Sequence, residues 1–216
     1  MKQHPDLSTL MSYSSGTLSL AFSTLVTSHI ENCDHCKEIV QIGNELGASM
    51  MENDIENKDK TEDFNEFLNK LNNKNNNSEI KEIDFDLNSE VPASLQRYIG
   101  TDLDEIQWSF FAPGIQKSQV KISNKSNCHL TFLKIKPNKK IPEHGHKGGE
   151  LTLVLKGAFE DENGTYAAGD IADHDTSTHH EPVVSSKEDC ICVIATDGPM
   201  VFKSMIANMY QSIVRI

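Results

Sequence analysis

Three residues near the N-terminus have side chains that commonly bind metal ions, and their spacing resembles that of zinc ligands. His29, Cys33 and Cys36 spell H-x3-C-x2-C, and zinc sites use the C-x2-C spacing repeatedly. If one helix runs through all three, positions i, i+4 and i+7 share a face. If the helix breaks between residues 31 and 33, the two cysteines still keep their tight spacing. A closed structural zinc site needs a fourth ligand.

The nearest further candidates for that ligand are His4 and His35. His35 is adjacent to Cys36, so its side chain would point away from the shared face, which favours His4. A redox C-x2-C pair is the alternative, but thioredoxin-like pairs occur in a βαβ context. This stretch has a helical pattern on both sides. We therefore expect zinc on His4, His29, Cys33 and Cys36.

A second group of ligand types lies in the segment P-E-H-G-H-K-G-G-E. Residues an even number apart share a strand face, so His144, His146 and Glu150 point the same way unless the glycines introduce a bulge. Two imidazoles and a carboxylate suit Zn, Fe, Mn, Ni or Cu. The pair His179 and His180 is the obvious source of a fourth ligand. The alternative is three polar residues on a solvated strand face.

The elements that position the first group have helical periodicity over about residues 7–51. A short helix is expected around residues 6–13, before a break at Ser14-Ser15-Gly16. The next helix has one apolar face, made of Leu18, Ala21, Phe22, Leu25, Val26 and His29. A third helix from about Asp34 to Met50 has a stripe of Cys36, Ile39, Gly43, Leu46 and Met50.

Two segments separate these helices from the rest of the chain. A charged stretch over 52–63 indicates linker, and the asparagine-rich stretch over 72–79 has low complexity. Between them lies a short amphipathic helix with apolar residues at Phe64, Phe67, Leu68 and Leu71. This stripe either binds a groove of a partner protein or packs on its own bundle.

After about residue 90 the apolar period changes to two, with short runs at 129–136, 151–155 and 190–196. Several short strands with turn signals suggest a sandwich or barrel. We therefore predict an α+β chain of two domains, a zinc-binding helical bundle over 1–75 and a β domain over 91–216, joined by a linker over 76–90. Cys190 and Cys192 share a strand face, either as buried small hydrophobes or as a redox pair.

The net charge of the chain limits the classes of function that it can have. The chain has 20 Lys+Arg against 32 Asp+Glu, a net charge of −12, which argues against direct nucleic-acid binding. Residues 1–88 hold 7 Lys and no Arg against 16 acids, a net of −9 that would complement a basic partner. No apolar run reaches the ~18 residues of a membrane span, and no secretory signal opens the chain. We expect a cytoplasmic protein with reduced cysteines.

Two motifs resemble a known family. The H-x-H-x3-E-x6-G of residues 144–157 is similar to the first motif of the cupins, small β-barrels that hold a metal on three His and one Glu. The second cupin motif is altered, with Ala167 where proline is usual. His180-Glu181-Pro182 resembles the H-x-P of one cupin branch, the C-terminal domain of ChrR-type zinc anti-sigma factors. The Y-S-S-G of residues 13–16, H-x3-C-x2-C and the block over 157–166 also resemble that family.

The resemblance implies a non-enzymatic anti-sigma factor that binds an extracytoplasmic-function-type sigma factor in a 1:1 complex and inhibits transcription initiation. It implies structural zinc on the four N-terminal residues. It also implies a cupin β-barrel with zinc or another divalent transition metal on His144, His146, Glu150 and His180. Release would follow oxidative stress, by singlet oxygen or organic peroxide, sensed through the cupin domain. We further expect that the free chain can form a homo-oligomer.

The main rival is a metal-dependent cupin enzyme, a dioxygenase or isomerase with a helical accessory domain. Three His and one Glu support iron or manganese chemistry as well as zinc. The N-terminal half discriminates between the two, because an oxygenase needs no acidic H-x3-C-x2-C bundle. A plain metal-storage protein would not need the long β domain.

Overall fold

Three helices begin the chain: α1 (Leu7–Ser14), α2 (Leu20–Ile30) and α3 (Asp34–Ile55). The α1 helix ends where Gly16 takes a φ of +70°, which a right-handed helix cannot continue. Because α2 ends at Ile30 and α3 begins at Asp34, Cys33 lies in the turn between them, as in the broken-helix alternative. Residues 52–55, expected to be linker, still belong to α3.

The computed structural model describes residues 2–55, 69, 85–123 and 128–202. The predicted partner-binding stripe of Phe64, Phe67, Leu68 and Leu71 lies outside the described residues. Within the described ranges, no helix has both the length and the apolar composition needed to cross a membrane.

The C-terminal half is a β domain of three sheets. The largest, in the order β1-β2-β3-β11-β5-β8, contains β1 (Ser109–Ala112), β2 (Ile115–Lys121), β3 (His129–Ile135), β11 (Cys190–Thr196), β5 (Glu150–Lys156) and β8 (Ile171–His174). The second is β10 (Val183–Val184), β6 (Ala158–Asp161) and β7 (Gly164–Ala167). The third is β12 (Met200–Phe202), β4 (His144–His146) and β9 (His179–His180).

A short helix, α5 (Ala93–Ile99), and a 3₁₀ turn (Leu103–Glu105) precede β1. The sequence pattern placed this segment in the predicted β domain over 91–216 and predicted no helix here. Two turns of helix are too short to show a clear helical period, and α5 is held mainly by burial of Leu95 and Ile99.

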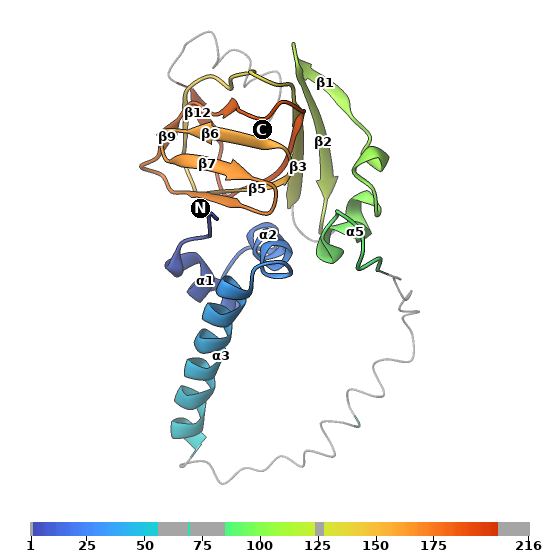
Figure 1. The fold of residues 1–216 in the computed structure, drawn as a ribbon. Helices are drawn as coiled ribbons and strands as arrows, with labels where there is room; N and C mark the ends of the chain where they lie inside the picture. The colour runs from blue at the N-terminus through green and yellow to red at the C-terminus, as the bar shows by residue number, and fades with distance from the viewer. Residues whose placement is uncertain (1, 56–68, 70–84, 124–127, 203–216) are drawn as a thin grey trace.

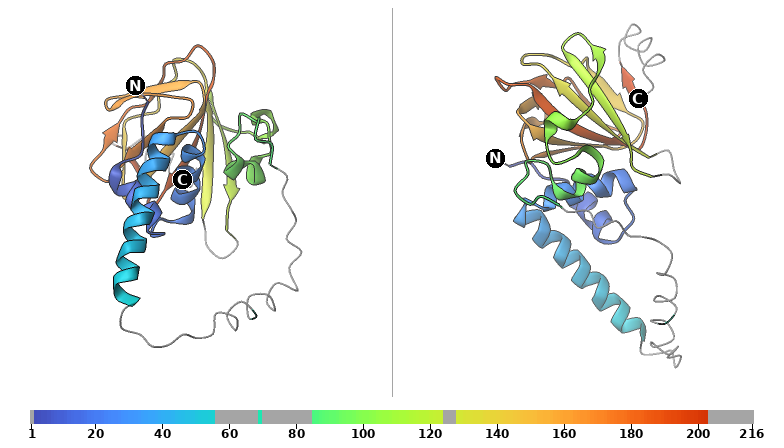
Figure 2. Two further views of the ribbon diagram at one scale, coloured as in Figure 1. Left: turned by 60° about the horizontal axis from the view of Figure 1, so that its bottom comes forward. Right: turned by 90° about the vertical axis from the view of Figure 1, so that its right-hand side faces the viewer.

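The α2 helix packs directly on the large sheet, against β11 and β5, and one apolar cluster is continuous from α1 to the strands. The predicted face of α2 is confirmed, since Ala21, Phe22, Leu25 and Val26 are all buried. Figures 1 and 2 show α1 and α2 against one side of the β domain, with α3 extending away from it.

Strand β11 lies between this cluster and the interior of the β domain. Its Ile191, Val193 and Ala195 belong to the cluster shared with the helices. Cys190, Cys192 and Ile194 alternate with them and belong to a second cluster inside the β domain. A strand buried on both faces has a continuous apolar sequence, which explains the run CICVIA.

Candidate metal centres

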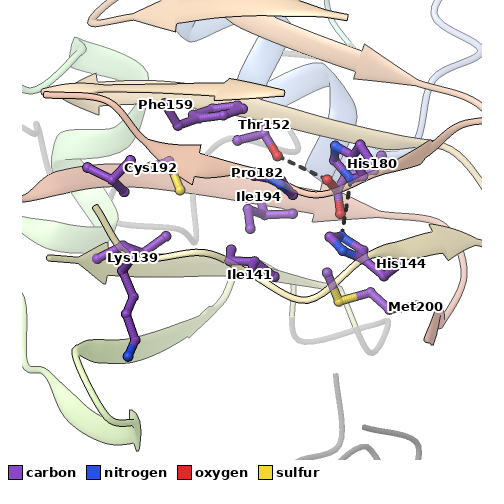
Figure 3. Close-up of a pocket in the computed structure, with 13 residues that line it drawn as sticks. Lys139, Ile141, His144, Thr152, Phe159, His180, Pro182, Cys192, Ile194 and Met200 are labelled. Carbon is purple, nitrogen blue, oxygen red and sulfur yellow. Dashed lines mark hydrogen bonds between the residues drawn. The ribbon is translucent and has the colours of Figure 1, made fainter. Parts of the chain in front are cut away.

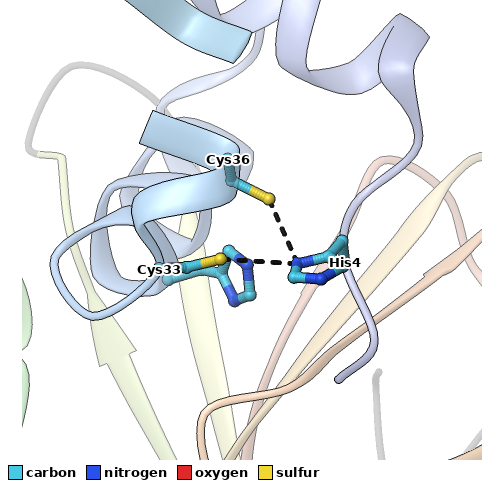
Figure 4. A group of neighbouring side chains, drawn as sticks. His4, Cys33 and Cys36 are labelled. Atoms are coloured by element: carbon cyan, nitrogen blue, oxygen red, sulfur yellow. Dashed lines mark hydrogen bonds between the residues drawn. The ribbon is translucent and has the colours of Figure 1, made fainter. Parts of the chain in front are cut away.

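The N-terminal ligand types come from three places in the chain. His29 lies in the last turn of α2, Cys33 in the α2–α3 turn and Cys36 in the first turn of α3. His4 lies in the segment that precedes α1. Its Nδ1 is 3.4 Å from Cys33 Sγ and 3.3 Å from Cys36 Sγ. Figure 4 draws both interactions as dashed lines. One ligand atom from each of the four residues lies within 4.8 Å of the others, whereas His35 is exposed and outside this group.

The chemistry of this cluster suits zinc. The His29 Nδ1–H donates to the Gly169 carbonyl oxygen over 2.9 Å, which leaves a buried Nε2 with no hydrogen-bond partner. Burial lowers the pKa of His29 to about 4, so its ring is neutral. Burial, then a hydrogen bond with Cys33, raises the pKa of the Cys36 thiol to about 12. Zinc would displace the thiol protons of Cys33 and Cys36 and accept the lone pair of His29 Nε2.

The spacing of the ligand atoms also fits. Zn–S bonds of ~2.3 Å and Zn–N bonds of ~2.0–2.1 Å give a tetrahedron with S···N edges of about 3.5 Å. The two measured S···N distances of 3.4 and 3.3 Å are close to that edge. The four residues could therefore hold one zinc ion with little rearrangement.

The second cluster lies inside the β domain. His144 and His146 are on β4, but the expected continuous strand is interrupted at the glycines, and Glu150 begins β5 in a different sheet. Gly148 lies in this interruption and packs closely on another loop. A Cβ on it would lie 2.8 Å from the Asp197 carbonyl carbon. The turn brings Glu150 back beside the two histidines.

His180 on β9 completes this group, which we call the cupin cluster: His144, His146, Glu150 and His180. Its Nε2 is 3.1 Å from His144 Nε2 and 3.3 Å from His146 Nε2. The Nδ1 of His146 is 3.5 Å from a carboxylate oxygen of Glu150. All four side chains are buried. His179, the alternative, is exposed and contacts the Ser177 carbonyl oxygen.

The electrostatics favour cation binding. Burial lowers the pKa of His144 to about 4 and that of His146 to about 3, so both rings are neutral and have a lone pair to donate. Burial raises the pKa of Glu150 to about 7. Both the His146 Nδ1 and one Glu150 oxygen lack a hydrogen-bond partner. A divalent cation would satisfy these buried atoms and stabilise the carboxylate.

The cavity beside the cupin cluster is small. Its lining includes His144, Glu150 and His180 together with Cys192 and Met200. Figure 3 labels His144, His180, Cys192 and Met200 around it. Its volume is about 30 Å³, whereas pockets for organic ligands typically have ~300–1,000 Å³. This space suits a metal ion and a water molecule.

Sequence reasoning missed two residues that contact His180. Asp161 on β6 accepts a hydrogen bond from His180 Nδ1 over 2.9 Å. His174 on β8 is buried, with its ring perpendicular to that of His180 at 4.2 Å and no hydrogen-bond partner for either nitrogen. Asp161 lies within the family-like block over 157–166, but no spacing pattern connects it with the metal ligands. No local spacing pattern identifies His174, because β8 lies far along the sequence from the ligands on β4.

We predict that Asp161→Asn weakens metal binding by the cupin cluster. A carboxylate that accepts the second N–H of a ligating histidine fixes its ring and tautomer, and its loss typically costs about 10–100-fold in metal affinity. Chelator competition with the purified full chain measures this. The matched control is Glu160→Gln, whose exposed side chain lies next in the chain on β6. Equal affinities for wild type and Asp161→Asn would contradict the prediction.

Both cysteines of the predicted redox pair are buried on β11. A hydrogen bond with Cys190, then burial, raises the pKa of the Cys192 thiol. Thiolates are the reactive form, so burial and the raised pKa leave Cys192 little reactivity, and the cavity that it lines is its nearest open space. We therefore predict that peroxide changes the alkylation of Cys192 no more than that of half-buried Cys128, measured by peptide mass spectrometry. Loss of Cys192 labelling with peroxide, at unchanged labelling of Cys128, would instead support the redox pair.

Comparison with known proteins covers both parts of the chain. A family model described as the ChrR cupin-like domain matches residues 96–200. The sequence is 32% identical to the anti-sigma-E factor ChrR of Cereibacter sphaeroides, over 100% of this chain and 99% of that protein. The chain belongs to the ChrR family of anti-sigma factors. This assignment confirms the predicted combination of N-terminal helices with a cupin-like β domain.

The fold agrees with the family assignment. The chain matches one in the crystal structure of Rhodobacter sphaeroides SigE in complex with the anti-sigma ChrR, with a TM-score of 0.74 and 32% identity. The match covers 91% of this chain and 99% of that chain. The similarity to ChrR therefore includes the helices that carry the H-x3-C-x2-C motif as well as the cupin-like domain.

Proposed function

We propose that this member of the ChrR family binds an extracytoplasmic-function-type sigma factor in a 1:1 complex and inhibits transcription initiation. The observation that carries the proposal is an apolar stripe on α3, made of Ile42, Leu46 and Met50. Their exposed fractions are 58%, 58% and 66%. At spacings of four they share one helix face, and α3 extends away from the β domain. Such a face fits an apolar groove on a partner.

Two further observations support a sigma factor as that partner. The related ChrR occurs in a complex with SigE. The net charge of −9 over residues 1–88 complements the basic surfaces that a DNA-binding protein presents. In this proposal the helical domain spans residues 1–75 and the cupin domain 91–216, with 76–90 as linker. Phe64, Phe67, Leu68 and Leu71 would add to the partner contact.

Metal binding supports this function in two ways. Zinc on His4, His29, Cys33 and Cys36 would fix the α2–α3 turn and so the direction in which α3 extends. A divalent transition metal on the cupin cluster would join strands from two sheets. We propose that oxidative stress acts through the cupin domain to release the sigma factor in the cytoplasm. The small cavity at the cupin cluster favours this regulatory function over that of a dioxygenase or isomerase.

Co-expression with the candidate sigma factor, followed by size-exclusion chromatography and metal analysis, tests the proposal. The expected result is a 1:1 complex with two metal ions per chain. The same measurement on the free chain tests whether it forms a homo-oligomer. A chain that contains iron, turns over a substrate and never co-elutes with the sigma factor would contradict the anti-sigma function and favour the enzyme.

A further inference from the structure

The cupin-like domain holds both histidines of the N-terminal cluster. The Gly169 carbonyl oxygen, in the turn between β7 and β8, accepts the hydrogen bond from His29 Nδ1. The segment that carries His4 runs along β8. There Asp170 Oδ1 accepts from the Gln3 backbone N–H over 3.2 Å. The two cysteines, by contrast, are carried by α3 and the turn before it.

Further contacts fasten the same segment to β8. The Ile171 N–H donates to the Gln3 carbonyl oxygen over 3.4 Å, so both backbone groups of Gln3 are held, its N–H by the Asp170 carboxylate and its carbonyl oxygen by the Ile171 backbone. Asp173 Oδ2 accepts from the Asp6 N–H over 3.0 Å. His4 is therefore held from both sides, by Asp170 before it and by Asp173 after it.

The Asp170 carboxylate contacts both the β7–β8 turn and the N-terminal segment. It is buried, and its Oδ2 accepts from the Ala167 N–H over 3.0 Å, which closes the β7–β8 turn. Its Oδ1 is the atom that holds Gln3. One carboxylate thus fixes the shape of the turn and the position of the N-terminal segment together. An amide in its place has only one acceptor oxygen.

The other end of β8 reaches the cupin cluster. His174, the last residue of the strand, pairs with Glu150 of β5 in the sheet register. Its ring contacts that of His180. The segment from Gly169 to His174, which we call the β8 bridge, therefore contacts the N-terminal cluster at its start and the cupin cluster at its end.

We propose that the β8 bridge is the outer shell of the N-terminal zinc site and links its affinity for zinc to metal occupancy of the cupin cluster. The inference rests on the proposed zinc ligands and deepens the proposed function, since it describes a route from sensor to inhibitory domain. Metal on Glu150 and His180 holds the end of β8, and an ordered β8 holds His29 and His4 in position for zinc. By linkage, zinc strengthens metal binding by the cupin cluster equally.

The experiment uses the full chain loaded with Co²⁺ at the N-terminal site. Thiolate-to-cobalt absorption reports this site alone, because the cupin cluster contains no sulfur ligand. The rate of cobalt loss to a chelator is compared among wild type, His144→Ala, which removes a cupin ligand, and Asp170→Asn/Asp173→Asn. Asp175→Asn is the matched control, since its exposed carboxylate binds Ser177 in its own turn.

Both His144→Ala and the double aspartate variant are expected to bind N-terminal cobalt more weakly, by a factor within the ~5–150-fold range typical of the affinities of coupled sites, and therefore to lose it faster to the chelator. In the double aspartate variant, adding His144→Ala should accelerate cobalt loss by a smaller factor than it does in wild type. The aspartate substitutions have by then already uncoupled the two metal sites. Asp175→Asn should match wild type. Asp173→Asn alone replaces the double variant if circular dichroism shows that the latter does not fold.

Two results would overturn the link: a cobalt loss rate unchanged by His144→Ala, or additive effects of His144→Ala and the aspartate substitutions. The proposed function fails in a distinguishable way. If wild type shows no thiolate-to-cobalt absorption, the zinc site itself is refuted. If that absorption is present and the sigma factor binds, but the variants behave as wild type, only the β8 bridge is refuted.

Discussion

Replacing Cys33 and Cys36 together with serine should remove the N-terminal zinc and abolish sigma-factor binding. Both cysteines are buried, and they join the α2–α3 turn to the segment before α1 through His4. Structural zinc contributes on the order of 10 kcal/mol of folding free energy in small domains. In this variant, the two serine hydroxyl groups would also be buried where the cysteine sulfur atoms pack in the wild type, which adds a desolvation cost.

Three measurements check this result on one preparation: metal content, thermal unfolding and pull-down of the sigma factor. We expect one metal ion fewer per chain, earlier unfolding of the helical part and no pull-down. The control is Cys128→Ser, because Cys128 is half-buried and outside both clusters. A double variant that still binds the sigma factor stoichiometrically would refute the structural function of zinc.

Introducing aspartate at Ile42 and Leu46 should weaken sigma-factor binding by at least about 100-fold while the chain stays folded. Burying a fully exposed aliphatic side chain contributes ~1.5–3 kcal/mol, and each of these two is 58% exposed, so losing both at the interface costs about 2–3 kcal/mol. An unpaired carboxylate in an apolar groove adds to this cost. Both positions are exposed in the free chain. The free energy of unfolding should therefore change by only ~0.5 kcal/mol per substitution.

Titration calorimetry with the purified sigma factor measures the affinity, and metal analysis confirms that zinc is retained. Phe110→Asp is the matched control, since Phe110 is 77% exposed but lies on β1 of the β domain. Wild-type affinity in the double α3 variant, or an equal loss in Phe110→Asp, would show that the stripe is not the contact surface.

Elements with a strong local period could be predicted closely from the sequence. The buried face of α2 and strand β11, at Cys190–Thr196, agree with the pattern. The stripe of the third helix agrees only in part, since Cys36 is buried but Leu46 and Met50 are exposed. Periodicity shows which residues share a helix face. It does not show whether that face packs within the chain or is left for a partner.

Metal ligands that are only a few residues apart could also be predicted from the sequence, because local structure alone brings them together. Side chains of Cys33 and Cys36, or of His144 and His146, are brought together by one local element whatever the rest of the chain does. His4 and His180 were identified from the number of ligands that a metal needs and from the family resemblance. Their approach to the clusters depends on contacts 29 and 36 residues apart along the chain.

The sequence by itself determined the types of ligand, their local spacing, the helical and β parts of the chain and the acidic charge. Only the tertiary structure decided that Asp161 and His174 contact His180, and that Gly169, Asp170 and Asp173 hold the segment of His4 and His29. These contacts join residues up to 167 positions apart. Such contacts form only when burial of apolar surface packs α2 on the large sheet, and local sequence patterns contain no record of that packing.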